Sequence, residues 1–343
     1  MTGIEAGKTW SRIGAEVAPT SSAASGVWGS LNEVSGYVGA GTWPAPFFGA
    51  AYFGGGMNAS NSRESTIDKF TFPDDTRSTL GTGLTVGRAY LAGMANSGTA
   101  GYFAGGNNSS FVLLSSVEKV AFPGDTISTL GTGLSAANRA LGGMANSGTA
   151  GYFGGGITSA SYVVTVDKFA FPGDSRSTLG TGLSQARGEI GSMANSGVAG
   201  YFGGGTSGPY YDMIDKFAFP GDTRTTLASG LSTATQQLSA MSNNAVAGYF
   251  TGGMQSGASK TATVQKCAFP SDTRSILGTG LSAATSTLAA TANSGTAGYV
   301  GGGIVSVQVA TVDKFAFPGE TRTTLGTGLS QGVSALAAMA DNN

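Results

Sequence analysis

The sequence predicts an all-β fold built from six copies of one four-stranded unit, and three observations support this prediction. A Tyr within a Gly-rich motif recurs every 48 to 50 residues, at Tyr52, Tyr102, Tyr152, Tyr201, Tyr249 and Tyr299. The copies differ in length only in the loop after this motif, which holds 10, 10, 9, 8 and 10 residues in the first five copies. The segments between turn sequences are rich in aromatic, β-branched or small residues and are too short for helices. A constant frame with one adjustable loop is typical of a repeat architecture.

The four predicted strands are clearest in the copy that spans residues 187–231. They read RGEIGSMAN, AGYFGG, MIDKFAFP and RTTLASGL, with the turn sequence NSG between the first two and PGD between the last two. Four short antiparallel strands in a repeat of about 50 residues make up one blade of a β-propeller. Large aromatic residues on one strand and small residues on its neighbours favour blades that pack face to face.

The first strand of the unit is distributed unevenly, which bears on how the chain closes. We expect it near residues 88–95, 138–145, 187–194, 235–242, 285–292 and 333–340. Pro44 and Pro46 interrupt the stretch where the first copy should have it, whereas the last copy ends with an extra one, Ser334 to Ala340. We therefore predict that the C-terminal strand completes the first blade and closes a propeller of six blades over residues 51–343.

Residues 1–50 form a separate segment, because they have no copy elsewhere in the chain. This segment contains all three Trp residues, Trp10, Trp28 and Trp43, together with a stretch of Ala, Ser and Thr. A loosely built segment rich in Ser and Gly becomes ordered most easily by docking on a partner. We predict that it anchors the propeller to a larger assembly through the three Trp side chains. The alternative is an arm that folds back on its own propeller.

The composition argues against several classes of partner. Charged residues make up 11% of the chain, the net charge is −1, and the basic residues are evenly spread. This pattern favours neither nucleic acid nor an anionic membrane surface as a partner. The sequence has no apolar run of the length, about 18 residues, that a transmembrane helix needs. The repeated Gly clusters lack the Lys and Ser/Thr of a phosphate-binding loop and are expected to be turns.

The residues also argue against catalysis, metal binding and a cofactor. The chain has no His and one Cys, Cys267, which occupies a position filled by Phe in other copies and is expected to be buried. Acidic residues recur evenly in the third strand and in the turn after it, whereas an active site needs unlike groups that converge once. We expect these acids to be structural. A turn acid and the Arg two residues later, such as Asp174 and Arg176, are expected to form an exposed pair.

The variable loops carry the stronger functional signal. They read MNASNSREST, NNSSFVLLSS, ITSASYVVT, TSGPYYDM, MQSGASKTAT and IVSVQVAT, and all six should emerge on one face of the propeller. One interpretation is that loops free of packing constraints simply drift in sequence. The other is that they form a binding face, with the aromatic residues Phe111, Tyr162, Tyr210 and Tyr211 as anchors.

The repeat resembles the kelch family of β-propellers. The matching positions are Tyr152-Phe153-Gly154-Gly155, Val166 to Phe169, Leu179 and Arg187, and the resemblance extends over all six copies. It departs from the family pattern in the fourth strand, where Arg176 or its equivalent stands in place of the characteristic Trp. The late Arg is present only as Arg88 and Arg187.

The sequences of the repeats are also similar to those of repeat proteins encoded by marine bacteriophages. The shared motifs are YFGGG followed by DKF and LGT. The segment before the repeats is also similar, with Ser25-Gly26-Val27-Trp28 and then Trp43-Pro44. This resemblance implies a virion structural protein of the tail or a fibre, assembled in the host cytoplasm.

Together these observations predict a non-enzymatic bacteriophage virion protein that displays a six-bladed kelch-like propeller at the particle surface for host attachment. Residues 1–50 would contact other virion proteins, and the protein would be present as a homo-oligomer. The alternative is a carbohydrate-binding propeller that recognises a host surface glycan or protein through its variable loops.

Overall fold

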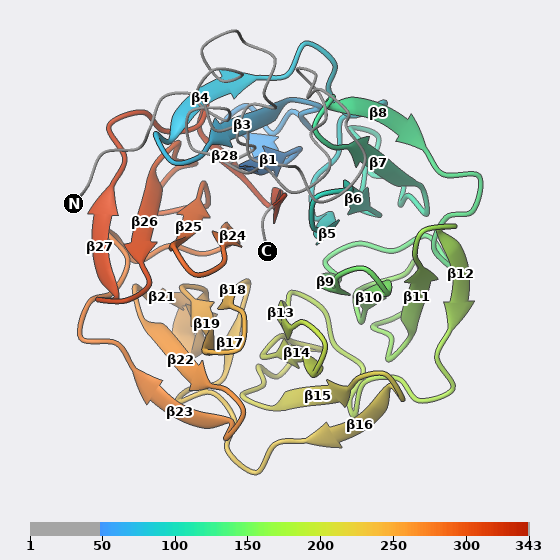
Figure 1. Cartoon of the computed structure of the whole chain (residues 1–343), viewed down its shortest axis with the longest axis vertical. Coiled ribbons are helices and arrows are strands. Elements are labelled where there is room, and N and C mark those ends of the chain that lie inside the picture. The colour runs from blue at the N-terminus through green and yellow to red at the C-terminus, as the bar shows by residue number, and fades with distance from the viewer. Residues whose placement is uncertain (1–48, 342–343) are drawn as a thin grey trace, which may run out of the picture. The chain divides into compact units, whose positions relative to one another are not determined.

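The described part of the chain consists almost entirely of β-strands. The computed structural model describes residues 49–341, which belong to the compact unit Gly49–Asn343. Six four-stranded antiparallel sheets account for most of this unit, and Figure 1 shows them arranged around a common centre. Within residues 49–341 the helical element is a short 3-10 turn, η1 (Ser256–Ala258). The predicted all-β fold of four-stranded antiparallel units is confirmed.

Each sheet is numbered in chain order and is given from the strand nearest the centre outwards. Sheet 1 contains β29 (Ala337–Ala340), β1 (Ala50–Gly54), β3 (Ile67–Thr71) and β4 (Thr76–Thr79). Sheet 2 contains β5 (Ala92–Asn96), β6 (Ala100–Ala104), β7 (Val117–Ala121) and β8 (Thr126–Thr129). Sheet 3 contains β9 (Gly142–Asn146), β10 (Ala150–Gly154), β11 (Val166–Ala170) and β12 (Ser175–Thr178).

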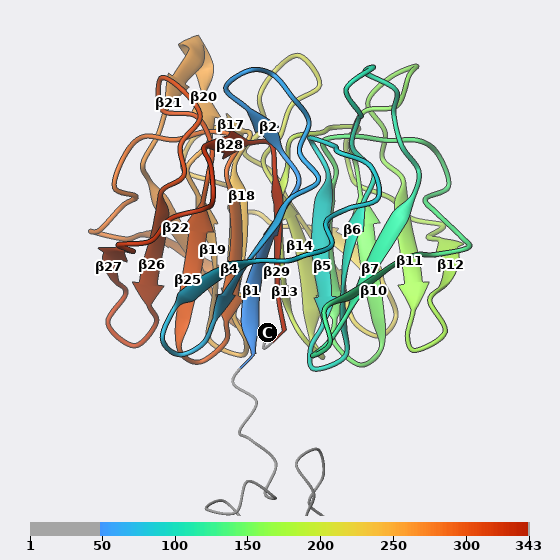
Figure 2. The same cartoon turned by 90° about the horizontal axis from the view of Figure 1, so that it is seen from above.

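Sheet 4 contains β13 (Gly191–Asn195), β14 (Ala199–Gly203), β15 (Ile214–Ala218) and β16 (Thr223–Thr226). Sheet 5 contains β18 (Ser239–Asn243), β19 (Ala247–Thr251), β22 (Val264–Ala268) and β23 (Thr273–Ile276), and sheet 6 contains β24 (Ala289–Asn293), β25 (Ala297–Gly301), β26 (Val312–Ala316) and β27 (Thr321–Thr324). Two small sheets join β17 (Thr235–Gln236), β20 (Met254–Gln255) and β21 (Ser259–Lys260), and β2 (Met57–Asn58) with β28 (Val333–Ser334). In Figure 2 these short strands and the variable loops lie at one end of the sheets, called here the loop end.

Small residues in one sheet receive large residues from the next. All five residues of β1 are buried, and so are those of its equivalents in the other sheets. A Cβ added at Gly54 would lie 2.7 Å from the ring of Phe103, and one at Gly154 would lie 2.7 Å from the ring of Phe202. These Gly residues therefore allow the Phe of the following sheet to pack directly on the backbone, as the alternation of large and small residues predicted.

The C-terminal strand lies in the first sheet. β29 pairs antiparallel with β1, with Tyr52 opposite Met339. The strands nearest the centre lie next to one another in the cycle β29, β5, β9, β13, β18, β24 and back to β29. The interrupted first copy is thus completed by the end of the chain, which is the pairing that Pro44 and Pro46 predicted.

The strands nearest the centre begin later than the sequence predicts. Their first residues are Ala92, Gly142, Gly191, Ser239, Ala289 and Ala337, four positions after the predicted starts. The residues just before these strands turn away from the sheet because one of them adopts a positive φ, such as Tyr90 (φ 59°) and Ala140 (φ 58°). The predicted extended starts were wrong at this point, and the departure shapes the candidate site.

Some predictions fall on residues outside the described range. Trp10, Trp28 and Trp43, and with them most of the predicted anchor over residues 1–50, lie outside residues 49–341. Over the described range, no helix has the length and apolar character required to cross a membrane.

Candidate binding site at the mouth of the central cavity

Six equivalent residues, one from each repeat, meet at the centre of the loop end. They are Tyr90, Ala140, Glu189, Gln237, Thr287 and Ala335, and all six have φ between 52° and 59°. The N–H group of each donates a hydrogen bond to the carbonyl oxygen of the preceding member at 2.7 to 2.9 Å, and Tyr90 donates to Ala335. The six bonds therefore form a closed circle. We refer to these six residues, together with the cavity that they line, as the mouth.

The backbone of the mouth is uniform although its side chains differ. Positive φ is uncommon for non-Gly residues and unfavourable for a β-branched residue such as Thr287. Because the same conformation is present in all six repeats, the hydrogen-bonded circle imposes it regardless of side chain. Ala140 and Ala335 show that a methyl group is compatible with this position.

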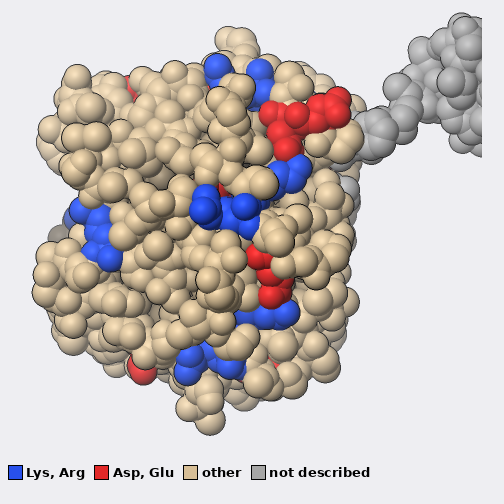
Figure 3. Space-filling model, turned by 90° about the vertical axis from the view of Figure 1, so that its left-hand side faces the viewer, with Lys and Arg blue, Asp and Glu red and all other residues tan. Residues whose placement is uncertain are grey.

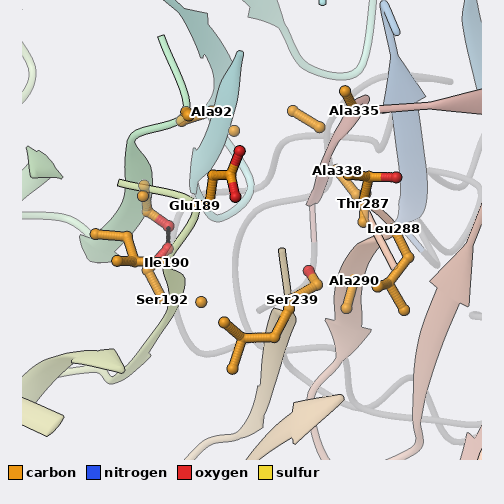
Figure 4. A pocket seen from close by; sticks show the side chains of 18 of the residues that line it. Ala92, Glu189, Ile190, Ser192, Ser239, Thr287, Leu288, Ala290, Ala335 and Ala338 are labelled. Carbon is orange, nitrogen blue, oxygen red and sulfur yellow. Dashed lines mark hydrogen bonds between the residues drawn. The ribbon is translucent and has the colours of Figure 1, made fainter. Parts of the chain in front are cut away.

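The cavity of the mouth has a volume of about 110 Å³, and residues from all six repeats line it. Figure 4 shows the carboxylate of Glu189 and the side chain of Thr287 at this cavity, together with Ser192 and Ser239. Deeper in, the innermost strands approach closely, since a Cβ added at Gly93 would lie 2.5 Å from the carbonyl oxygen of Ala338. The polar groups of the mouth thus stand above a narrow floor of small residues.

Glu189 is the charged residue that lines this cavity. Burial raises the pKa of its carboxyl group, whereas the neighbouring Gln237 amide and the charge of Arg139 lower it. Among the described residues, Arg139 is the charged side chain whose field acts on this pKa. A mechanism that uses two carboxylates would need a second acid here, and the described residues place none beside Glu189.

Tyr90 connects the mouth with the surrounding loops. The Arg139 guanidinium lies over the Tyr90 ring, with 5.5 Å from Cζ to the ring centroid. Burial raises the pKa of Tyr90 and the charge of Glu189 raises it further, whereas Arg139 and Arg63 lower it. Tyr90 of the first repeat therefore lies beside Arg139 of the second repeat and lines the same cavity as Glu189 of the third.

Two of the predicted binding residues lie near this cluster. Backbone bridges join Arg139 to Ile157 and Ile157 to Tyr162. Burial raises the pKa of Tyr162, with the charge of Glu189 adding to the rise and that of Arg139 opposing it. Phe111 is 71% exposed. Its ring is covered on one side by the Arg63 guanidinium, 4.6 Å from Cζ to the centroid. The structure thus brings Phe111 and Tyr162 toward the Tyr90 side of the mouth.

The other two predicted binding residues have different neighbours. The Tyr210 hydroxyl lies 3.9 Å from the sulfur of Met254, in the loop of the fifth repeat. The Tyr211 hydroxyl shares a 2.8 Å hydrogen bond with Ser207 in its own loop. The four predicted aromatic anchors therefore do not form one cluster.

The repeated turn acids join neighbouring sheets. Asp174 accepts hydrogen bonds from the Tyr102 hydroxyl and the Lys119 ammonium group, both at 2.7 Å. The same arrangement recurs around the molecule and ends with Asp75, which binds Tyr299 at 2.7 Å and Lys314 at 2.6 Å. The predicted pair of Asp174 with Arg176 was wrong, because Arg176 points to Asp167 at 3.7 Å. On the flank in Figure 3 charged residues are correspondingly few and of mixed sign.

The acids of the third strand also have structural partners. Asp167 accepts hydrogen bonds from the Ser135 backbone and hydroxyl at 2.8 Å, and thereby ties the preceding linker to sheet 3. In sheet 4 Asp215 forms a 3.0 Å ion pair with Arg187, and both side chains are fully buried. In sheet 2 Glu118 forms the equivalent buried pair with Arg88. The two Arg residues that match the kelch pattern are thus the two that pair with these acids.

The described residues contain no group of three or more His, Cys, Asp or Glu that could hold a metal ion. Cys267 is buried, as predicted, and burial raises its pKa to about 11, so the thiol stays protonated near neutral pH.

Sequence reasoning missed Tyr90, Glu189 and Arg139. The available signal for Tyr90 and Glu189 was the third residue of the segments RAYLAGMAN, NRALGGMAN, RGEIGSMAN, TQQLSAMSN, TSTLAATAN and VSALAAMAD, whereas Arg139 is the second residue of its segment. The third position varies strongly, whereas the residue after it is Leu or Ile in all six segments. No protein-family model matches the chain, and a search of curated proteins found none with significant similarity.

Proposed function

We propose that the described unit is a six-bladed, kelch-like β-propeller closed by its C-terminal strand. The support comes from contacts that pass through all six sheets and return to the first. The backbone circle at the mouth returns from Ala335 to Tyr90. The Tyr–acid–Lys contacts return from Tyr299 and Lys314 to Asp75. The linker contacts return from Ser330 to Asp68 at 2.7 and 2.8 Å.

We further propose that this propeller is a non-enzymatic attachment module of a bacteriophage virion, carried on its N-terminal segment. The observation that carries the attachment role is the mouth, where one backbone conformation presents Tyr, Ala, Glu, Gln, Thr and Ala. Because backbone hydrogen bonds hold the circle, these side chains are free to differ and to be adapted to a ligand. The virion location is supported by the resemblance of the repeats to bacteriophage proteins.

A carbohydrate-binding function is the second candidate. It is supported by the mixture of side chains around Tyr90, where the Arg139 guanidinium lies over the Tyr90 ring and Glu189 lines the same cavity as Tyr90. Aromatic faces combined with a few convergent polar groups are typical of small-ligand sites. The two proposals are compatible, because an attachment protein can bind its host through a saccharide.

The experiment that tests the attachment role is binding of the labelled full chain to bacterial cells. The same assay is done with an alanine-mouth variant, which carries the substitutions Tyr90→Ala, Glu189→Ala, Gln237→Ala and Thr287→Ala. We expect the full chain to bind a susceptible strain and the variant to lose binding without losing its fold. Equal binding by both would contradict a role for the mouth.

The virion role is tested separately by incorporation into particles. We expect the full chain to be found on purified particles and a chain without residues 1–50 to be absent from them. Normal incorporation of the shortened chain would contradict the anchor.

A further inference from the structure

We infer that the mouth binds a sugar residue bearing a carboxylate, with Arg139 holding the acid group and Glu189 and Gln237 holding hydroxyl groups. This inference rests on the proposed attachment function and names the class of ligand for it. It follows from the pairing of the basic side chains, from the donors and acceptors at the cavity, and from the aromatic surfaces beside it.

Arg139 differs from most basic residues of the described unit because it lacks an acidic partner there. Arg77, Arg176, Arg224 and Arg322 each lie 3.6 to 3.7 Å from an Asp of the third strand. Among residues 49–341, Arg139 has neither an ion pair nor a side-chain hydrogen bond, and its guanidinium lies over the Tyr90 ring. A guanidinium group that lies over an aromatic ring keeps its N–H groups for other partners, and their fork suits bidentate binding of a carboxylate.

Arg63 gives the same side of the mouth a second positive charge. It is 9% exposed, its guanidinium lies over the Phe111 ring and donates to the Asn61 carbonyl oxygen at 2.8 Å, and its Nε has no hydrogen-bond partner among the described residues. The charges of both Arg63 and Arg139 act on Tyr90. An anionic ligand group is therefore favoured on this side and disfavoured beside Glu189, which fixes how the ligand is oriented.

Glu189 and Gln237 supply the complementary groups for hydroxyls. They are consecutive members of the backbone circle, because the Gln237 N–H donates to the Glu189 carbonyl oxygen at 2.9 Å. A carboxylate accepts hydrogen bonds and an amide both donates and accepts them, so the pair suits adjacent hydroxyl groups that do both. Thr287, at the next position, also lines the cavity, and its hydroxyl donates a 2.6 Å hydrogen bond to the Ser286 carbonyl oxygen.

The aromatic residues complete the match to a sugar ring. Tyr90 lines the cavity, and Tyr162 pairs through a backbone bridge with Ile157, which pairs in turn with Arg139. An aromatic face packs against the C–H face of a sugar while the ring hydroxyls reach polar groups at the edge. The cavity of about 110 Å³ is too small to enclose an oligosaccharide, so we expect one terminal residue to enter and the rest of the chain to lie across the loop end.

The test is titration calorimetry of the full chain with two matched probes, a disaccharide that ends in glucuronic acid and the same disaccharide ending in glucose. We expect the acidic probe to bind at least about tenfold more tightly, since only it offers a charged partner to Arg139. Arg139→Gln should remove this preference. Glu189→Gln should weaken both probes, and for the acidic probe the loss should be smaller because a nearby repulsion is also removed.

Arg274→Gln is the matched control. Arg274 lies in β23 at the outer edge of sheet 5, where Gln265 replaces the acid found in other sheets, and it too has no ion pair among the described residues. This variant should keep the full preference for the acidic probe. Equal binding of both probes, or a preference that survives in Arg139→Gln, would overturn the carboxylate assignment. Absence of binding to both probes would overturn the saccharide assignment.

These outcomes are separable from failure of the proposed attachment function. If cells bind the full chain and the alanine-mouth variant does not, while neither probe binds, attachment stands and the ligand class is wrong. If cells do not bind the full chain, the attachment function itself fails.

Discussion

The two ends of the described unit connect their sheets in different ways. At the mouth, neighbouring repeats are joined by backbone hydrogen bonds, such as Ala140 N–H to the Tyr90 carbonyl oxygen at 2.7 Å. At the opposite end, side chains make the connections. Asn96 Oδ1 accepts from the Gly148 N–H at 2.7 Å, and Asn146 Oδ1 accepts from the Gly197 N–H at 2.8 Å.

This difference explains where the repeats are allowed to vary. A connection made by a side chain requires that residue in every copy, which is why the hairpin sequence around NSG changes little. A connection made by the backbone leaves the side chain free, so the mouth carries five residue types at six equivalent positions. The frame is therefore held by side-chain identity at one end and by the backbone at the other, where we propose that the side chains bind a ligand.

The largest expected effect comes from opening the frame. Deleting residues 331–343 removes β29 and exposes its partner β1, whose residues are buried. Loss of Leu336 and Met339 alone should remove about 1.5–3 kcal/mol of hydrophobic stabilisation each, and an unpaired edge adds to the loss. We expect thermal unfolding monitored by circular dichroism to shift down by more than about 10 °C. An unchanged melting temperature would contradict closure by the C-terminal strand.

The next largest effect concerns the buried ion pair of sheet 4. Asp215 contacts Arg187 at 3.0 Å in the interior and Arg224 at 3.7 Å near the surface. Arg187→Met should lower the free energy of unfolding by about 3–5 kcal/mol, because it leaves a buried carboxylate without its charge partner. Arg224→Ala, the control on the same carboxylate, should lower it by less than about 1 kcal/mol in urea titrations. Similar losses for both would contradict the difference in burial.

Asp341 allows a test of the side-chain connections at the end opposite the mouth. It stands where the other repeats have Asn, and its carboxylate accepts from the Gly98 N–H at 2.9 Å. Burial raises its pKa from 3.8 to about 6. The folded state therefore favours the protonated acid, and its contribution to stability is greatest below pH 3.8 and declines as the pH rises through 6.

Asp341→Asn should remove this penalty. At pH 7.5 we expect a gain of about 2–3 kcal/mol in the free energy of unfolding, because a shift of about two pKa units is being relieved. At pH 4 the gain should be much smaller. Urea unfolding of both proteins at the two pH values measures it, and a gain independent of pH would show that the charge is not responsible.

The smallest expected effects come from removing the hydroxyl group of one tyrosine at each end of the unit. Tyr102→Phe deletes the 2.7 Å hydrogen bond to Asp174 and should lower the free energy of unfolding by about 1–2 kcal/mol. Tyr90→Phe deletes a hydroxyl at the mouth and should change it by less than about 0.5 kcal/mol. The reverse order would contradict the assignment of frame and binding functions to the two ends.

The sequence carried most of the information about the frame. The Tyr spacing, the alternation of large and small residues, and the prolines at Pro44 and Pro46 together predicted four-stranded sheets and the pairing of β29 with β1. The error at the start of the innermost strands has a physical cause. Residues such as Ala140 have no intrinsic preference for positive φ and adopt it because of a bond from another repeat.

The candidate site was predicted less well for a related reason. Phe111 and Tyr162 stood out because aromatic residues in variable loops are recognisable in a sequence. Glu189 and Arg139 are single charged residues in separate repeats, and only the circular arrangement brings them to Tyr90. Similarly, Asp174 meets Tyr102 and Lys119 of the preceding sheet rather than the Arg two residues later.

The most direct test of this account is amide hydrogen exchange at the six mouth positions of the alanine-mouth variant. If the backbone circle holds the frame without help from side chains, all six amides should remain as protected as those of the buried strands, including Tyr90→Ala at the closing bond. Rapid exchange at these positions in the variant, with protection in the unmodified chain, would show that the side chains hold the circle together. The variation of these side chains would then have a structural cause, and this would contradict the proposal that the mouth is a binding site.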